Sequence, residues 1–471
     1  MTASIFWFRR DLRFYDNPGL SAARSSSPTV YGVFCTAELE RLNRRQRAFV
    51  LGSLKHMRLV LEKRNASISM IDGDTPDALV RAARRLGAQS VHCSRSYDRE
   101  ERRAEEAARS ALEEAGIAFR VHAGDVVHEP EAVAERKQAP GEGYRVFPPF
   151  FAAWQALEAP TPIAEAWCNG SDDQPGPLAV PADRAAVSAG EAVGRALLQS
   201  FVASRATDYA VNGAYPGRDG TSNLGAHLRF GCVSPRTVHR AVAERMAKTW
   251  TLAPERSSMR AFLRQLAMRD FFIHLAYYAP ALHDDALQEK MRGFPWSSDE
   301  KALAAWTEGR TGYPLIDAAM RQLHAEGNVH QRAAICAASF CCFDLGLDWR
   351  LGREVWMKQL VAADAALCDG NWQWIAGVGS DQAAYPRIYN PVKQARQFDS
   401  QAVYVRRWCQ ELRKLPTAAA LEPWKLDRQR QIELGFFTPD QYPPPMVDHE
   451  TVARDLLKTY RDYREKEALR S

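Results

Sequence analysis

The sequence has no apolar run long enough to cross a lipid bilayer, which argues against a membrane-spanning protein. Arg9 and Arg10 interrupt the N-terminus where a secretory signal would need its apolar segment. The nine cysteines are odd in number and scattered, so we expect free thiols in a reducing cytoplasm. They form no paired CxxC framework, and we therefore expect no structural metal or iron–sulfur site.

Two common nucleotide signatures are also missing. No GxGxxG or Walker motif follows the first expected strand, so a standard dinucleotide or nucleoside triphosphate site is not supported there. The net charge of +5 is compatible with nucleic acid as a partner, but it is smaller than that of a dedicated nucleic-acid-binding protein. The 471 residues suffice for two or three domains with a large core.

Residues 1–130 alternate short apolar runs with amphipathic segments. This alternation predicts a doubly wound parallel sheet. Thr75 before Pro76 is expected to cap a helix. The expected strands are 5–8, 30–34, 67–71, 90–93 and 118–121, and the expected helices are 45–63, 76–86 and 99–116.

Residues 131–200 are rich in Pro, Gly, Ala and acidic residues and predict a long surface connection. Within it, the aromatic run 147–154 is expected to dock on another part of the chain. From residue 201 onward strand signals vanish and helical periodicity dominates. We therefore predict an α/β domain over 1–130, a linker over 131–200 and an all-α domain over 201–471.

One stretch of the helical part stands out, DAALCDGNWQWIAGVGSDQAAYPRIYNP, which begins at Asp364 and ends at Pro391. It is too polar for pure core and too aromatic for an ordinary loop. Aromatic faces beside fixed polar groups suit a flat, conjugated ligand. A buried aromatic cluster is the alternative, and periodicity alone does not decide between them.

Two further motifs suggest anion binding. In the loop GRDGTSNLG, the hydroxyls of Thr221 and Ser222 next to helix-start amides suit a phosphate, although most such loops are N-caps. In the helix expected over 257–278, Arg269 lies on an apolar stripe and needs an anionic partner. That partner is either a buried carboxylate or a ligand phosphate.

Together, several motifs resemble the photolyase/cryptochrome family over nearly the whole chain: FWFRRDLRFYDNPGL, DGTSNL followed by GCVSPR, RDFF, AWTEGRTGYPLIDAAMRQL, GNWQW and RIYNP. The resemblance implies an N-terminal domain able to hold a light-harvesting antenna of the folate or deazaflavin type. It also implies a helical domain that buries a folded FAD. The residues that match the FAD site are Thr221, Ser222, Asn223, Leu224, Gly225, Phe262, Arg269, Gln331, Arg332, Asp364 and Cys368.

The resemblance also assigns roles to individual residues. Asp364 matches the Asp that pairs with the polar edge of the isoalloxazine. Trp372, Trp349 and Trp296 match the chain of three Trp that reduces the flavin after light absorption. Glu101 matches a Glu that contacts a folate antenna, although a lone Glu on a charged helix is usually solvated.

Several positions depart from the pattern of repair enzymes. The loop reads TSNLG instead of TSRLS, which removes an Arg and a Ser near the phosphates. Cys368 replaces the Asn that faces flavin N5, as in insect-type cryptochromes. Ala334 and Ala362 replace an Arg–Asp pair beside the flavin, and losing both avoids leaving one buried charge alone.

The expected lesion pocket is altered as well. Gln265 and Met268 replace a Glu and a Trp one helical turn apart, whereas Trp374 is retained. Ile335, like Gln331, replaces another pocket residue, and neither is the His that marks the (6-4) subgroup. The residues expected to contact DNA are Gln265, Met268, Trp374 and Arg387.

These observations leave three functions, of which one, a flavin redox protein without photochemistry, would make the intact Trp chain a coincidence. The first is light-driven repair of cyclobutane pyrimidine dimers in DNA, in which Trp372, Trp349, Trp296, Cys368, Gln265, Met268 and Trp374 serve catalysis. The second is a cryptochrome-like blue-light photoreceptor that acts on an unknown signalling protein. We expect a cytoplasmic monomer with no membrane partner, and we favour repair.

Overall fold

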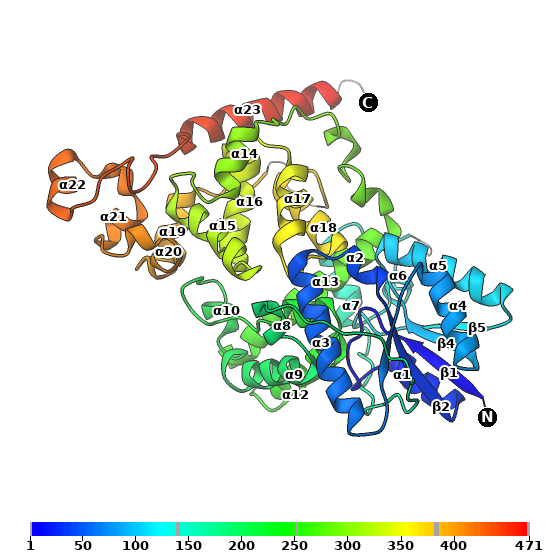
Figure 1. Ribbon diagram of the computed structural model, residues 1–471. Coiled ribbons are helices and arrows are strands. Elements are labelled where there is room, and N and C mark those ends of the chain that lie inside the picture. The colour runs from blue at the N-terminus through cyan, green and yellow to red at the C-terminus, as the bar shows by residue number, and fades with distance from the viewer. Residues whose placement is uncertain (1, 138–141, 251–252, 381–385, 469–471) are drawn as a thin grey trace. The chain divides into compact units, whose positions relative to one another are not determined.

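Figure 1 shows the computed structural model, which describes residues 2–137, 142–250, 253–380 and 386–468. Part of the stretch from Asp364 to Pro391, residues 381–385, thus lies outside the described residues. The chain divides into two compact units. Unit 1 comprises 1–208, 222–280 and 361–364, and unit 2 comprises 209–221, 281–360 and 365–471.

Unit 1 contains a five-stranded sheet with the order β3-β2-β1-β4-β5, in which every pair of neighbours is parallel. The doubly wound parallel sheet predicted from the alternation is therefore confirmed. The chain reverses its direction of winding between β1 and β4, where this fold commonly binds ligands. The strands are β1 (Ala3–Trp7), β2 (Thr29–Cys35), β3 (Ile68–Ile71), β4 (Ala88–Ser94) and β5 (Ala118–His122).

The central strand β1 is buried on both faces. Its residues alternate between two cores, as the strand period of two requires. Phe6 joins a core with α1 (Pro18–Ser26) and α3 (Arg44–Glu62), whereas Trp7 joins one with α4 (Thr75–Arg85) and α5 (Arg99–Glu114). The helix cap differs from the expectation by one position, because Asp74 is the N-cap and Thr75 is already helical.

The connection after the sheet contains short helices, which the sequence patterns did not predict. The aromatic run forms α7 (Phe147–Gln155), where Phe150 packs against Phe271 of α13 (Pro254–Tyr278) with ring centroids 5.2 Å apart. Trp154 Nε1 on α7 donates to Asp270 of α13 at 3.0 Å. The expected docking of this run is thus onto α13. The remaining helices of unit 1 are α2 (Ala37–Glu40), α6 (Pro130–Ala134), α7 (Phe147–Gln155), α8 (Arg184–Val187), α9 (Glu191–Ser200), α11 (Gly225–Arg229), α12 (Pro235–Ala247) and α13 (Pro254–Tyr278), and a π-helical turn η1 (Phe201–Arg205) continues α9.

The described part of unit 2 is helical apart from an isolated bridge between Ser297 and Leu347. The single helix expected over 331–344 becomes α16 (Gln331–Ser339) followed by a π-helical turn, η4 (Phe340–Asp344). One hydrophobic core contains Trp306, Phe340 and Trp372. The main helices are α10 (Tyr209–Asn212), α14 (Glu300–Thr307), α15 (Pro314–Glu326), α16 (Gln331–Ser339), α17 (Trp349–Gln359), α18 (Ala365–Ala376), α19 (Pro391–Phe398), α20 (Val403–Trp408), α21 (Thr417–Leu421), α22 (Arg428–Leu434) and α23 (His449–Ala468).

None of the helices within the described ranges combines the length and the apolar character needed to cross a bilayer. All nine cysteines are buried and unpaired, in agreement with the expected free thiols.

Candidate functional site

The candidate site in unit 1 contains the buried carboxylate of Asp364. It is 4% exposed and accepts a hydrogen bond from the Arg10 guanidinium. Arg229 Nε lies 3.6 Å from the same carboxylate and donates to the carbonyl of Ala363 at 2.8 Å. Two cations therefore lie beside the Asp364 carboxylate in a site that excludes most water.

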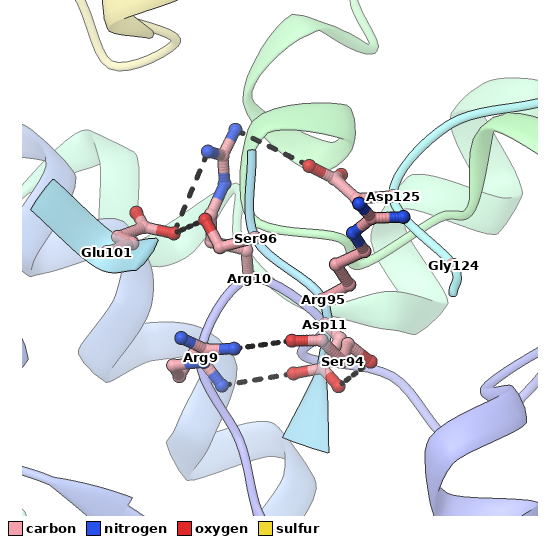
Figure 2. Close-up of a pocket in the computed structure, with 9 residues that line it drawn as sticks. All are labelled: Arg9, Arg10, Asp11, Ser94, Arg95, Ser96, Glu101, Gly124 and Asp125. Atoms are coloured by element: carbon pink, nitrogen blue, oxygen red, sulfur yellow. Dashed lines mark hydrogen bonds and ion pairs between the residues drawn. The ribbon is translucent and has the colours of Figure 1, made fainter. Parts of the chain in front are cut away.

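Glu101 belongs to the same charged cluster. Its carboxylate accepts from Ser96 Oγ at 2.6 Å and lies 3.7 Å from Arg10 and 3.6 Å from Arg229. Burial acts to raise the pKa of Glu101, but the two guanidinium groups outweigh it, so the pKa is lowered. A Glu on a charged helix is usually solvated, but Glu101 is not. Its side chain on α5 points toward Arg10 (Figure 2).

The anionic partner of Arg269 lies within unit 1. Its guanidinium donates to the Asp125 carboxylate at 2.9 Å and to the Asp125 carbonyl at 2.6 Å. Asp125 also lies 3.6 Å from Arg10, which links Arg269 to the cluster around Asp364. Of the two partners left open for Arg269, the structure therefore shows the carboxylate. Breaking one member of such a buried network costs about 3–5 kcal/mol, because the partner charge is left uncompensated.

A small cavity lies beside this cluster at the carboxyl ends of β1 and β4. Arg9, Ser94 and Asp125 are among the side chains that line it, and its volume is about 10 Å³ (Figure 2). That volume holds about one water molecule. The edge of the sheet where this fold commonly binds ligands is thus filled by the chain's own ion pairs.

The loop expected to bind phosphates adopts an irregular conformation before α11. Asn223 has a positive φ of 57°, which Asn tolerates better than most residues, and the Leu224 amide lies 3.4 Å from Ser222 Oγ. A Cβ at Gly225 would lie 3.3 Å from the Cβ of Ala362. Two departures from the family pattern, Gly225 and Ala362, are therefore neighbours, and together they remove side-chain volume from one place. Thr221, which precedes this loop, belongs to unit 2.

The face of α13 carries three other expected residues. Phe262 is 7% exposed and contacts Phe201, with ring centroids 4.5 Å apart. Gln265 and Met268 follow at helical spacing and are half-buried, so both remain accessible on unit 1.

Trp372 lies in the core of unit 2 and is 1% exposed. Its ring centroid is 5.0 Å from that of Trp356 and 6.1 Å from that of Trp306. The sequence interpretation named neither of these two neighbours. Trp356 follows Trp349 by seven residues on α17, a spacing that puts both on one helix face and could have revealed it.

Trp349 and Trp296 belong to the same core. Trp349 begins α17 and is 3% exposed, whereas Trp296 is half-buried and packs on Phe294 with centroids 4.5 Å apart. The indole nitrogens of Trp349 and Trp372, like that of Trp356, are buried and have no hydrogen-bond partner among the described residues. An oxidised indole there would find no hydrogen-bond partner among the described residues to take its proton.

Unit 2 also presents a strip of arginines over aromatic rings, which we call the Arg–aromatic strip. It begins with Arg387, whose guanidinium carbon lies 5.3 Å from the Trp374 ring centroid. Burial raises the pKa of Tyr389, and Arg387 and Arg332 oppose it, so this tyrosine lies near both. Arg332 lies 4.2 Å from the ring centroid of Phe398.

The strip continues beyond Phe398. The Tyr215 ring contacts Phe398 with centroids 5.8 Å apart, and Arg218 lies 4.2 Å from the Tyr215 centroid. Alternating cations and aromatic faces suit a single nucleic-acid strand, since the cations neutralise phosphates and the rings stack on bases. Only Trp374, Arg387 and Arg332 of this strip were singled out in the sequence.

The remaining expected residues of unit 2 lie on two helices. Gln331 is exposed in the first turn of α16, beside Arg332. Cys368 is 8% exposed on α18, one turn before Trp372. The helix spacing therefore places Cys368 and Trp372 on one face of α18.

Two family models match this chain. The family model described as "DNA photolyase" matches residues 4–166, and that described as "FAD binding domain of DNA photolyase" matches residues 262–462. A deoxyribodipyrimidine photo-lyase of Synechococcus sp. is 31% identical over 97% of this chain and 96% of its own. The Escherichia coli enzyme of the same name is 33% identical over 98% of both chains.

Two solved structures are similar over nearly their whole length. A class III photolyase from Agrobacterium tumefaciens is 29% identical with a TM-score of 0.86, covering 99% of this chain and 98% of its own. A cryptochrome from Synechocystis sp. is 26% identical with a TM-score of 0.88, covering 98% and 99%. The fold is that of photolyases and cryptochromes. The chain belongs to the photolyase/cryptochrome family and contains its FAD-binding domain.

Proposed function

We propose that the protein uses blue light and FAD to split cyclobutane pyrimidine dimers in DNA, by electron transfer from reduced flavin. The observation that carries the proposal is the Arg–aromatic strip, which suits the strand that bears the lesion. Relatives with this activity in their name, about one third identical over the full length, support it.

The residues around Asp364 fit the polar edge of a flavin. Arg229 Nη1 is buried and has no hydrogen-bond partner among the described residues, so a donor is available beside the Asp364 carboxylate. A flavin edge carries both an N–H and carbonyl oxygens, and such a donor–acceptor pair matches it. We assign the loop from Ser222 to Gly225 to the phosphates of the same ligand, whereas Arg269 is held by Asp125. When bound, FAD would absorb the light and supply the electron that splits the dimer.

The Trp residues of unit 2 would supply the electron that reduces the flavin. Trp372 would be the first donor, and we add Trp356 and Trp306 to the expected Trp349 and Trp296 as routes for the hole. Because no described group accepts the proton of Trp372 or Trp349, the hole would move on rather than be trapped as a neutral radical.

On the substrate side, Trp374 would stack on the lesion and Arg387 would contact a phosphate. Gln265 would hydrogen-bond a base edge, and Met268 would touch the dimer without providing an aromatic platform. Stacking on such a platform contributes about 1–3 kcal/mol per base, so binding should be weaker than in an enzyme that keeps the Glu–Trp pair.

A second candidate function is that of a cryptochrome-like photoreceptor with little or no repair activity. Cys368 favours it, because a thiol is a poor hydrogen-bond acceptor for flavin N5 where repair enzymes place an amide. The partner would then be a signalling protein instead of damaged DNA. The similarity to the Synechocystis cryptochrome is compatible with this function.

An antenna chromophore of the folate or deazaflavin type does not fit the cavity at the sheet edge, which holds about one water molecule. We keep the functional division at 1–130, 131–200 and 201–471 as a proposal. The match over 262–462 falls within its third part, whereas the match over 4–166 extends past residue 130. We also propose a monomer in the cytoplasm, where nine unpaired cysteines would stay reduced.

The experiment is dimer repair under blue light by protein whose flavin is fully reduced, with a single-stranded oligonucleotide that contains one thymine dimer. Wild type should repair in the light and not in the dark. Trp374→Ala should lose repair, whereas Trp250→Ala should keep it, because Trp250 is a 73% exposed indole of unit 1. Binding without repair by wild type would favour the photoreceptor.

A further inference from the structure

A groove of about 560 Å³ lies within unit 1 and has no part in the site described above. It is lined by α9, its continuation η1, and α12, which pack on one another (Figure 1). Leu198, Val202 and Ala241 contribute apolar surface to it. Clefts of about 300–1,000 Å³ with an apolar lining and a few polar groups are typical of small-molecule sites.

One wall of the groove is a preformed flat surface. The Glu191 carboxylate accepts the backbone N–H groups of Phe14 at 2.8 Å and Tyr15 at 2.9 Å, which fixes Tyr15 beside α9. Arg195, one turn after Glu191, places its guanidinium carbon 4.6 Å from the Tyr15 ring centroid. Glu165 forms an ion pair with Arg195 Nη1 at 3.1 Å. A planar ring could therefore stack there with little ordering of the wall.

The α12 part of the groove is positively charged. Arg245 and Lys248 are exposed in and just after the last turn of α12, and neither forms an ion pair within the described ranges of the chain. Glu244 is the carboxylate of this lining, and it is engaged at 2.6 Å by Arg240. The groove thus combines a flat aromatic–guanidinium wall with two available cations.

We propose that this groove binds a flat, conjugated ligand that carries a phosphate or carboxylate group. The ring would stack on Tyr15 and Arg195 over the apolar lining, and the anion would meet Arg245 and Lys248. Phosphate-bearing and carboxylate-bearing ligands share this chemistry. Of the two cavities of unit 1 described here, the one at the sheet edge holds about one water, so the groove is the one with room for such a ligand.

The test is equilibrium binding in the dark to the FAD-loaded protein, in which the flavin site is occupied. FMN probes a conjugated ring with a phosphate, and folic acid probes one with carboxylates. Saturable binding at one site per chain is expected for at least one of them. Arg245→Glu combined with Lys248→Glu should weaken it at least tenfold, because two attractive charges become repulsive.

Two further variants separate the groove from general surface charge. Lys63→Glu combined with Arg260→Glu makes the same change in charge at exposed positions of unit 1 outside the groove, and binding should stay within twofold of wild type. Ala241→Phe fills the groove without changing charge and should weaken binding at least tenfold. Flavin content and circular dichroism confirm that each variant is folded.

Each outcome decides the proposal. Binding of FMN alone identifies a phosphate ligand, and binding of folic acid alone identifies a carboxylate ligand. The proposal is overturned if neither binds, if the control pair weakens binding as much as the groove pair, or if Ala241→Phe binds like wild type. Dimer repair is not measured, so failure of the proposed repair activity would leave this result unaffected.

Discussion

Replacing Gly352 by alanine should slow the light-driven reduction of bound flavin without removing the flavin. Gly352 lies on α17, and a Cβ there would be 2.3 Å from Cη2 and 2.6 Å from Cζ3 of Trp372. Because carbon atoms pack at about 3.5–4.0 Å, the indole must move by about 1 Å. Trp372 is 1% exposed in a dense core, so the displacement is resisted on all sides.

The cost of this overpacking should be about 1–3 kcal/mol in the free energy of unfolding. The moved ring also changes its spacing to Trp356 and Trp306, which now lie 5.0 and 6.1 Å away. The assay is the loss of the visible absorbance of oxidised flavin under blue light with an external reductant. We expect a several-fold slower rate at unchanged FAD content, and almost complete loss in Trp372→Phe.

The matched control is Gly435→Ala. Gly435 has a φ of +60°, and no atom of the described residues lies within 4 Å of the position that a Cβ would take there. Alanine at this position therefore costs about 1–2 kcal/mol through backbone strain without touching a Trp. Both variants are destabilised, but only Gly352→Ala displaces the expected electron donor. If the two reduce their flavin at the same rate, the position of Trp372 does not control the reaction and the argument is refuted.

Three other predictions concern binding and stability. Gln265→Glu combined with Met268→Trp should tighten binding of dimer-containing DNA by roughly tenfold or more in fluorescence anisotropy, since a carboxylate and a stacking platform are restored; unchanged affinity would contradict the pocket assignment. Phe398→Ala should weaken single-strand binding by about 1–3 kcal/mol while leaving the salt dependence unchanged, because no charge is removed. Burial and the neighbouring His122, 3.0 Å away, lower the pKa of His92 to about 4. The stability that neutral His92 contributes is therefore fully present above about pH 6.5 and is lost as the pH falls toward 4. Urea unfolding should show a loss of up to about 3 kcal/mol in the free energy of unfolding over this pH range, and a smaller loss in His92→Asn. Equal pH profiles for the two proteins would exclude His92 as the source of the loss.

Local patterns in the sequence were sufficient for the architecture of the sheet. The strand expected over 5–8 is β1 at Ala3–Trp7, and the strand expected over 118–121 is β5 at Ala118–His122. Alternating apolar runs and amphipathic segments specify these elements, because a parallel sheet buries both faces and forces its strands to be apolar. The end of α16 was not predictable in this way, since α-helical and π-helical turns need the same apolar residues.

Long motifs in the sequence were also sufficient for the family and its FAD-binding domain, which relatives about 30% identical over the full length confirm. The type of each site residue could be read directly. The contacts of these residues could not, because they depend on segments that are distant in the chain.

Only the tertiary structure decided which charges and rings meet. Arg10 and Asp364 are 354 positions apart, and no local pattern indicates that they form an ion pair. From the sequence, Glu101 on a charged helix is expected to be solvated, whereas in the fold it lies beside the guanidinium groups of Arg10 and Arg229. Arg269 likewise needed an anion, and its identity, Asp125, follows from packing. The sequence determines which groups cannot stay unpaired in the core, whereas the fold selects their partners, because the cost of desolvation depends on the whole surroundings of a charge.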